Sequence, residues 1–238
     1  MKKIKYTDSF LPNQPFLNQY YNGGRQNYYI DLFNFLMRSN NIELPKKEFK
    51  MIESNRFPIS EMATNPVIIN FYKFLFKIIN PNKILEIGTF VGYSTLVFAK
   101  YSQKKAKITT LEKFSEFAEI AVKNFRNNKL DKKIKLINED AGVALKKIIS
   151  KKEKFDFIFL DGDKGKYKQF FLMIEKIMSK KCVVVVDNVF FQGDNINKKP
   201  VTEKGKGVLS LINYIKKNKK YTYSLIPMYD GMMFIKKI

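Results

Sequence analysis

The sequence predicts an α/β fold: a doubly wound, mainly parallel sheet of seven strands with a C-terminal antiparallel hairpin and an N-terminal helical extension. Three observations support this class. From residue 84 onward, short apolar runs alternate with stretches of helical composition, which is typical of a parallel sheet covered on both faces. Two strand-like runs then flank Tyr229-Asp230-Gly231, which favours a closing hairpin. Before residue 84, the apolar residues follow helical spacing.

The elements are expected in a regular order. Apolar runs predict strands at 84–87, 107–111, 134–137, 155–160, 182–186, 221–227 and 232–237. Helices are expected at 28–40, 46–55 and 67–79 before the first strand, and at 94–101, 115–128, 141–150, 166–178 and 208–217 after it. Residues 1–22 contain two prolines and predict a loosely structured arm. We therefore expect a helical arm or cap over 1–56 and an α/β domain over 57–238.

Composition narrows the class of protein. Hydrophobic residues make up 45% of the 238, enough for a large core. The single cysteine, Cys182, cannot form an internal disulfide and suits a reducing compartment. No apolar run approaches the roughly 20 residues of a membrane span, and the basic start has no signal-peptide core. We expect a cytoplasmic protein with no membrane partner. The absence of histidine excludes histidine-ligated metals and histidine-based catalytic triads.

The net charge of +22 raises the question of a nucleic-acid partner. Only four of the 44 basic residues are arginines, the side chain better suited to phosphates and base edges. The lysines accompany many Asn, Ile, Phe and Tyr residues, as the codons of an A/T-rich genome would produce. We therefore favour solvated lysine faces over a dedicated nucleic-acid surface and keep the second interpretation open.

The turn after the first strand is suited to a nucleotide-sized ligand. Gly88, Gly92 and Ser94 follow the run Ile84–Ile87, so backbone N–H groups and a helix start can approach the ligand. Glu86 would repel a pyrophosphate and suits a cationic ligand that carries hydroxyls. An ordinary strand-to-helix turn is the alternative interpretation.

Acidic residues follow all five central strands. Ligands of open α/β sheets bind beyond the carboxyl ends of the strands. Glu112, at the end of the second strand, lies where an acid that holds ribose hydroxyls is expected. Asp161, Asp187 and Asn188 close the fourth and fifth strands and supply the hard oxygen ligands preferred by Mg²⁺, Mn²⁺ or Ca²⁺. Separate capping or turn roles are the alternative for each acid.

Six motifs occur in order: KILEIGTFVGYST, TLEK, EDA, FDFIFLDGDKGKY, VVVVDNVFFQG and YDGMMFIKK. Together they resemble the S-adenosylmethionine-dependent, divalent-metal-dependent O-methyltransferases of the catechol and caffeoyl-CoA type, over about residues 57–238. The resemblance implies a Rossmann-like methyltransferase domain with S-adenosylmethionine as methyl donor. It also implies a divalent cation, with Mg²⁺ expected first and Mn²⁺ or Ca²⁺ as alternatives, and a homodimer.

The resemblance also implies roles for individual residues. The expected donor contacts are Met62, Thr64, Glu86, Gly88, Thr89, Ser94, Glu112, Asp140, Ala141 and Asp163. Asp161, Asp187 and Asn188 would hold the metal, and Lys164 would act with Asp161 in catalysis as the base that accepts the hydroxyl proton.

The acceptor is less well defined by sequence. The family's acid-glycine-glutamine stretch is replaced by Val67–Asn70, the glycines usual before the fifth strand are Lys180–Cys182, and Gln192 replaces a substrate-binding Asn of plant enzymes. Our first hypothesis is methyl transfer to a hydroxyl of a metal-chelating, catechol-like small molecule. The alternatives are the same reaction on 5-hydroxyuridine in tRNA, or a non-catalytic RNA-binding relative. A nicotinamide dehydrogenase is disfavoured because the glycines do not form G-x-G-x-x-G.

Overall fold

The computed structural model describes residues 34–196 and 199–238. They fall into two compact units, one ending at Glu43 and one of Leu44–Ile238, and each is described by itself. In the first unit, residues 34–39 are helical, as expected for the end of the helix at 28–40. The start of that helix and the expected arm at 1–22 lie outside the described residues. The expected division after residue 56 stays a prediction, and residues 44–56 are described with the second unit.

A seven-stranded sheet runs through the described part of the second unit, which confirms the predicted fold class. Its order is β3-β2-β1-β4-β5-β7-β6. The first five strands pair in parallel, and β7 is antiparallel to both β5 and β6, so the expected hairpin is also confirmed. The strands are β1 (Lys83–Ile87), β2 (Lys107–Glu112), β3 (Ile134–Asn138), β4 (Phe155–Leu160), β5 (Met178–Asp187), β6 (Tyr221–Ile226) and β7 (Met232–Lys237).

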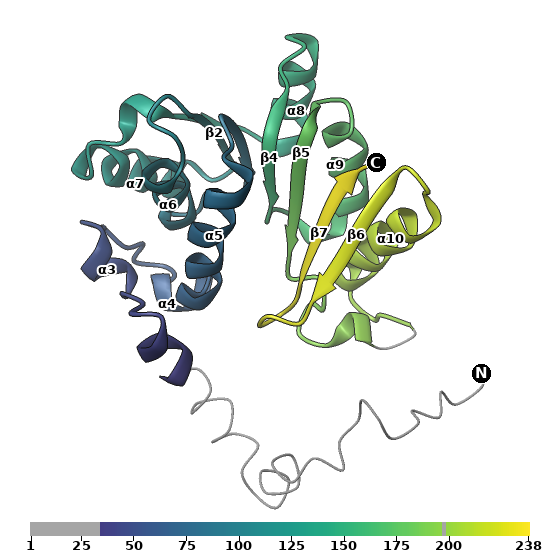
Figure 1. Ribbon diagram of the computed structural model, residues 1–238, viewed down its shortest axis with the longest axis horizontal. Coiled ribbons are helices and arrows are strands. Elements are labelled where there is room, and N and C mark those ends of the chain that lie inside the picture. The colour runs from purple at the N-terminus through teal and green to yellow at the C-terminus, as the bar shows by residue number, and fades with distance from the viewer. Residues whose placement is uncertain (1–33, 197–198) are drawn as a thin grey trace, which may run out of the picture. The chain divides into compact units, whose positions relative to one another are not determined.

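Helices cover both faces of the sheet (Figure 1). One face packs against α5 (Pro66–Ile79), α6 (Tyr93–Tyr101) and α7 (Ser115–Asn127). The other packs against α8 (Ala141–Ser150), α9 (Tyr167–Ile174) and α10 (Glu203–Lys217). Shorter elements are α3 (Pro45–Glu48), α4 (Ile59–Met62), η1 (Asp131–Lys133), η2 (Lys164–Lys166) and η3 (Asp194–Ile196). None of the helices in the described ranges is long and apolar enough to cross a membrane.

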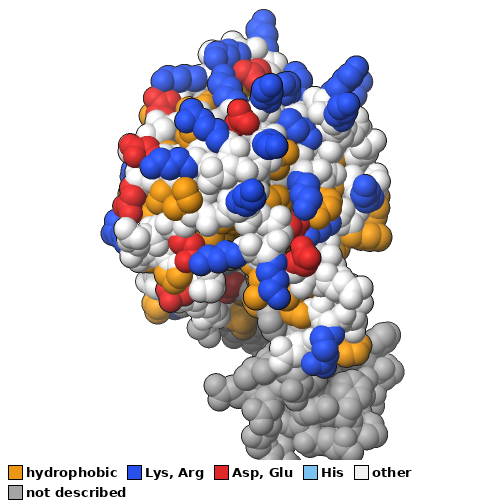
Figure 2. All heavy atoms as spheres, turned by 90° about the vertical axis from the view of Figure 1, so that its left-hand side faces the viewer, with side chains coloured by type: hydrophobic (Ala, Val, Ile, Leu, Met, Phe, Trp, Pro, Cys, Tyr) orange, Lys and Arg blue, Asp and Glu red, His pale blue; other side chains and the backbone are white. Residues whose placement is uncertain are grey.

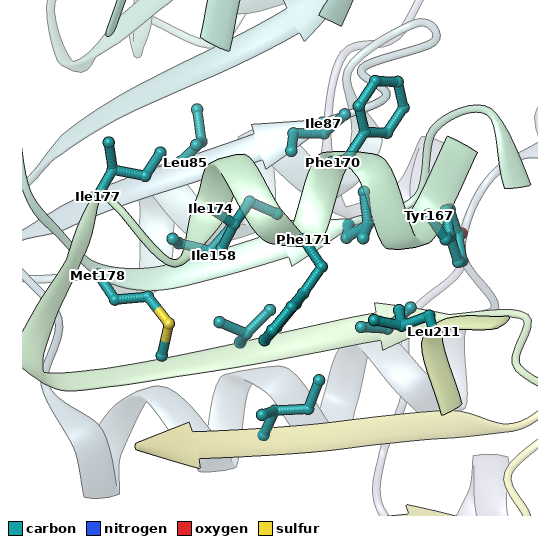
Figure 3. Packing of buried hydrophobic residues seen from close by; sticks show 14 of the residues in the cluster. Leu85, Ile87, Ile158, Tyr167, Phe170, Phe171, Ile174, Ile177, Met178 and Leu211 are labelled. Atoms are coloured by element: carbon teal, nitrogen blue, oxygen red, sulfur yellow. The ribbon is translucent and has the colours of Figure 1, made fainter. Parts of the chain in front are cut away.

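Each central strand contributes side chains to two hydrophobic cores, because successive side chains point to opposite faces of the sheet. Phe157 and Phe159 of β4 pack with α5 and α6, while Ile158 and Leu160 pack with α8–α10. Figure 3 shows the second core, where Phe170, Phe171 and Ile174 of α9 lie over Leu85, Ile87 and Ile158. This double burial explains why the strands are continuous apolar runs.

Several elements differ from the sequence prediction, among them the helix expected at 208–217, which begins at Glu203. The helix expected at 46–55 is only the single turn α3, and residues 50–54 form no helix or strand. The helix expected at 166–178 ends at Ile174, and β5 already begins at Met178. The polar start of β5 is stabilised by its neighbour, because Ser179 and Lys181 both bond the Asp156 carboxylate of β4.

Candidate active site

The expected site residues that follow the strands, unlike Met62 and Thr64, lie at one edge of the sheet, where the parallel strands end. The end of β1 and the loop after β4 are in direct contact, because Asp161 N donates to Ile87 O at 2.9 Å. Gly88, with φ +101°, allows this approach, since a Cβ there would overlap the Asp161 carbonyl. Ala141 begins α8 at the same edge, whereas Met62 ends α4 and is half exposed at 50%.

The glycine loop, defined here as residues 88–92, needs its second glycine as well. Gly92 has φ +87° and is the N-cap of α6. A Cβ at this position would lie 2.5 Å from the Phe125 ring of α7. Both a left-handed backbone and a missing side chain are therefore required, which confirms that this turn is built around its glycines.

Glu86 is completely buried and faces hydroxyl groups of its own fold. Its carboxylate accepts hydrogen bonds from Ser94 Oγ and Thr110 Oγ1, both at 2.5 Å, and from Thr95 Oγ1. Burial raises the pKa of Glu86 to about 7, against the opposing effect of these donors. With no exposed surface, this side chain orients Ser94 at the start of α6, and its expected donor contact stays a prediction.

A second hydroxyl extends this network into the glycine loop. Thr110 Oγ1 and Thr89 Oγ1 lie 2.5 Å apart. Because Thr110 gives its one hydroxyl proton to Glu86, Thr89 is the donor in this pair. The hydroxyl of Thr89 is thereby directed at Thr110, and the expected contact of Thr89 with the methyl donor stays a prediction.

Glu112, at the end of β2, is held by two backbone amides. Phe90 N and Phe114 N donate to its two carboxylate oxygens at 2.8 and 2.9 Å. Burial raises the pKa of Glu112, although these backbone hydrogen bonds oppose the shift. Because the backbone N–H groups of Lys113 and Thr89 also interact with this carboxylate, its expected contact with ribose hydroxyls stays a prediction.

Asp140 and Asp163 both cap local turns. Asp140 Oδ1 accepts from Gly142 N at 2.9 Å, and Asp163 Oδ1 accepts from Gly165 N at 3.1 Å. Lys166 Nζ lies 3.8 Å from the second oxygen of each. The capping roles considered for the acids are real here, and a ligand contact would use their remaining lone pairs.

Asp161 and Asp187 follow the same rung of the sheet, because Leu160 of β4 is in register with Val186 of β5. Burial and the charge of Asp161 raise the pKa of Asp187 to about 7. One Asp187 oxygen accepts from Asn188 N at 2.8 Å, and its backbone carbonyl accepts from Tyr167 Oη at 3.0 Å. Two carboxylates close together repel each other, and a bound cation would offset that repulsion.

A divalent cation would suit this donor set. Among the described residues, no three Cys, Asp or Glu side chains form a metal-binding group, so the Asn188 amide oxygen would be needed as third ligand. Asn188 has φ +55°, a left-handed conformation that asparagine tolerates better than most residues. Lys164 Nζ, 2.6 Å from Asp161 Oδ1, supplies the positive charge at this place in the structure.

The loop after β5 joins the C-terminal hairpin to the site. Gln192 N donates to Asp230 Oδ1 at 2.6 Å, and Phe190 N donates to Asp230 O at 2.8 Å. Gln192 is exposed and has φ +53°. The turn between β6 and β7 therefore holds the loop on which an acceptor contact was expected.

Sequence reasoning missed several residues that build this site. Thr95 and Thr110 bind Glu86, and Tyr167 supports Asp187. Tyr167 stood within the quoted motif, and Thr110 precedes Glu112 by one strand period, so both had a signal in the sequence. Asn124, buried in α7, had none, because it is one polar residue in an amphipathic helix.

The chain is similar to known proteins along most of its length. Residues 41–238 match the O-methyltransferase family. The chain is 28% identical over 233 residues to probable caffeoyl-CoA O-methyltransferase 2 of Dictyostelium discoideum, covering 95% of this chain and 97% of that protein. It is 26% identical to a catechol O-methyltransferase of Niastella koreensis, covering 72% of this chain and 80% of that protein.

Solved structures agree as well. An O-methyltransferase from Bacillus cereus in complex with SAH superposes with a TM-score of 0.71 at 27% identity, covering 74% of this chain and 83% of that one. An SAH-bound methyltransferase from Podospora anserina, at 20% identity, supports the fold alone, with a TM-score of 0.77 over 98% of this chain and 100% of that one. From the family match, which spans most of the chain, we conclude that this protein belongs to the O-methyltransferase family.

Proposed function

We propose that this enzyme transfers a methyl group from S-adenosylmethionine to a hydroxyl of a metal-chelating, catechol-like small molecule. The observation that carries the proposal is the convergence of Asp161, Asp187 and Lys164 beside the glycine loop at one edge of the sheet. The caffeoyl-CoA and catechol O-methyltransferases among the relatives support the same chemistry.

The glycine loop and Glu112 would hold the methyl donor. When bound, S-adenosylmethionine supplies an electrophilic methyl group. Glu112 would accept hydrogen bonds from the ribose hydroxyls, and Gly88 lets the loop pass close to the Asp161 carbonyl. Because methyl transfer demands in-line geometry, these residues contribute mainly by positioning. The complete burial of Glu86 and its three hydroxyl partners keeps this wall of the site rigid.

Asp161, Asp187 and Asn188 would hold a divalent cation, with Mg²⁺ preferred and Mn²⁺ or Ca²⁺ as alternatives. When bound, the cation orients the acceptor and lowers the pKa of its hydroxyl. Lys164 Nζ, beside Asp161, would accept the hydroxyl proton once it has released its own, because the ammonium that pairs with Asp161 has no free lone pair. With no histidine in the chain, Lys164 is the base that this part of the site offers.

A transfer assay with labelled S-adenosylmethionine tests the proposal. The acceptors are a panel of catechols and matched monophenols, each with and without EDTA. We expect label on catechols, its loss with EDTA, and little label on monophenols, which cannot chelate. EDTA-resistant labelling of both groups would contradict the metal-dependent mechanism, and no labelling of any phenol would contradict the proposed acceptor.

A second candidate acceptor is 5-hydroxyuridine in tRNA. It is favoured by the charge of +22 and by an open depression of about 410 Å³ lined by Lys46, Lys47, Lys50 and Lys129. Figure 2 shows lysines and arginines spread over one face, with acidic side chains between them, rather than gathered in one stripe. Bulk tRNA from a strain lacking the enzyme provides the test, because label on tRNA alone, with a steep salt dependence, would identify RNA as the acceptor.

A further inference from the structure

Asn124 is a buried polar residue of α7 that connects two separate segments of the chain. Its side chain has no exposed surface. Oδ1 accepts from Ile52 N at 2.7 Å, and Nδ2 donates to Ile52 O at 3.0 Å and to Val91 O at 2.9 Å. Both amide protons are used, and the orientation of the amide is fixed because its partners are one N–H group and two carbonyls.

Asn128, one helical turn later, makes the same pair of bonds with Lys50. Its Oδ1 accepts from Lys50 N at 3.0 Å, and its Nδ2 donates to Lys50 O at 2.9 Å. Four helical residues rise about 6 Å, and two extended residues span about 6.6 Å. Because these spacings nearly match, Asn124 of α7 and its C-cap residue Asn128 can bind residues 52 and 50 as a neighbouring strand would.

On its other side, Asn124 fixes the end of the glycine loop. Val91 lies within the loop and immediately precedes Gly92, the N-cap of α6. Ala121 and Phe125, on the same helix as Asn124, contact the Gly92 position. Phe90, in the middle of the loop, is bound to β2 through the hydrogen bond from its N–H to Glu112. Asn124 binds the next residue, Val91, to α7.

The segment held by Asn124 leads to the expected upstream donor contacts. Ser54 is buried, donates to Glu116 at 3.4 Å and accepts from Arg56 N at 3.0 Å. The ring of Phe57 then lies 6.3 Å from that of Phe117 on α7. Two residues later α4 begins, and it leads to Met62 and Thr64. The path from Ile52 to α4 thus follows the surface of α7.

We propose that Asn124 is a positioning residue for the methyl donor, which fixes the glycine loop and the segment leading to Met62 and Thr64 relative to each other. The inference rests on the donor site proposed above. An asparagine is required because its amide presents two donors and an acceptor at once. A leucine of similar size would remove these partners from the buried Val91 carbonyl and from the N–H and carbonyl of Ile52.

Matched variants test this role. We expect Asn124→Leu to raise the dissociation constant of S-adenosylhomocysteine at least about tenfold, measured by calorimetry without acceptor or metal. Asn128→Leu, which releases Lys50 but leaves Val91 untouched, should raise it less than about threefold. An unchanged constant in Asn124→Leu, or an equal increase in both variants, would overturn the proposal. If the wild type binds no S-adenosylhomocysteine, the donor site itself is wrong.

Hydrogen exchange on the unmodified chain gives a second test that does not depend on the folding of a variant. Saturating S-adenosylhomocysteine should slow exchange of the Ile52 amide, since donor binding stabilises the loop to which Asn124 ties it. The peptide that covers β6, the strand at the end of the sheet beyond β7, serves as reference and should change less. Equal protection of Ile52 with and without ligand would overturn the proposal, even if donor binding itself is confirmed.

Discussion

Lys164 and Asp161 form an ion pair in which Nζ lies 2.6 Å from Oδ1. Both side chains keep about a fifth of their surface exposed, at 18% and 21%, so the pair lines the site rather than the core. If Lys164 takes up the proton of the substrate hydroxyl, Lys164→Ala should lower turnover by about 10²–10⁴-fold. Affinity for the methyl donor should stay within about twofold of wild type, because Lys164 is not among the expected contacts of the methyl donor.

Lys168→Ala is the matched control for this prediction. Lys168 is exposed on α9, and its Nζ lies 5.8 Å from the centre of the Tyr214 ring. Its removal takes away the same charge without touching Asp161. Steady-state rates and donor titrations of both variants separate the outcomes. An equal loss of turnover in the two variants would show that Lys164 acts only through the general charge of the surface.

Asp187→Asn should abolish metal-dependent activity and stabilise the metal-free fold. The amide retains an oxygen for Asn188 N, while the charge disappears from a buried position next to Asp161. Because burial raises the pKa of Asp187 to about 7, the ionised carboxylate destabilises the metal-free fold above that pH. We therefore expect a higher melting temperature at pH 8 in EDTA, together with loss of the stabilisation by Mg²⁺ and of EDTA-sensitive activity.

Asp131→Asn controls for the loss of an acidic charge. Asp131 is exposed in η1, which precedes the start of β3, whereas the candidate site lies where the strands end. It should change neither the melting temperature nor the response to Mg²⁺. Thermal scans with EDTA and with added Mg²⁺ provide both readouts. Full retention of the Mg²⁺ effect in Asp187→Asn would remove Asp187 from the metal site.

Glu86→Gln should change how stability depends on pH. Burial raises the pKa of Glu86 from 4.5 to about 7, so between these values the folded state binds a proton that the unfolded state does not. The contribution of Glu86 to the unfolding free energy is therefore greatest at low pH and falls as pH rises to about 7. The full change is at most about 3 kcal/mol. Urea unfolding of both proteins at pH 5 and pH 8, in EDTA, measures it. An identical pH dependence in the variant would mean that Glu86 stays ionised.

Glu112→Ala should weaken donor binding by about 10–100-fold, the range expected when hydrogen bonds to a charged group are lost. Part of the loss would come from Phe90 N and Phe114 N, which lose their acceptor. Glu119→Ala, an exposed acid on α7, is the control. Calorimetric titration with S-adenosylhomocysteine measures both. An unchanged dissociation constant in Glu112→Ala would move the ribose site elsewhere.

Gly92→Ala should destabilise the protein more than Gly193→Ala does. The two glycines have nearly equal φ values, +87° and +86°. A Cβ at Gly92 would lie 2.5 Å from the Phe125 ring, whereas nothing lies within 4 Å of a Cβ at Gly193. Both variants carry the backbone cost of about 1 kcal/mol, and overpacking should add about 1–3 kcal/mol at Gly92 alone. Urea unfolding compares them, and equal losses would show that Phe125 moves aside without cost.

Most of the fold could be predicted because the signal is local. The apolar runs of β1 and β4 are buried on both faces, and turn residues bound them, so the strands are clear in the sequence. The start of β5 could not be predicted, because Ser179 and Lys181 look solvated until Asp156 is placed beside them. The helix expected at 46–55 failed for the same reason, since its backbone partners are side chains of α7.

The site was predictable where motifs mark the ends of strands, and less so where support comes from elsewhere. Glu112 and Asp187 follow strands directly, so their placement at one edge was expected from topology alone. The three hydroxyls around Glu86 come from two elements, and their convergence follows from tertiary packing. The acceptor, the metal, the homodimer and the cytoplasmic location stay predictions, because they depend on partners rather than on the packing of this chain.

The position of β7 has a consequence for the synthesis of the protein. Val183–Val186 of β5 form an uncharged, β-branched run, and β7 is the strand that covers its outer edge. During translation this edge stays open until residues 232–237 have left the ribosome. Exposed runs of this kind pair readily with other chains and aggregate. A nascent chain that stalls between β5 and β7 would therefore depend on chaperones, even after strands β1 to β5 have paired.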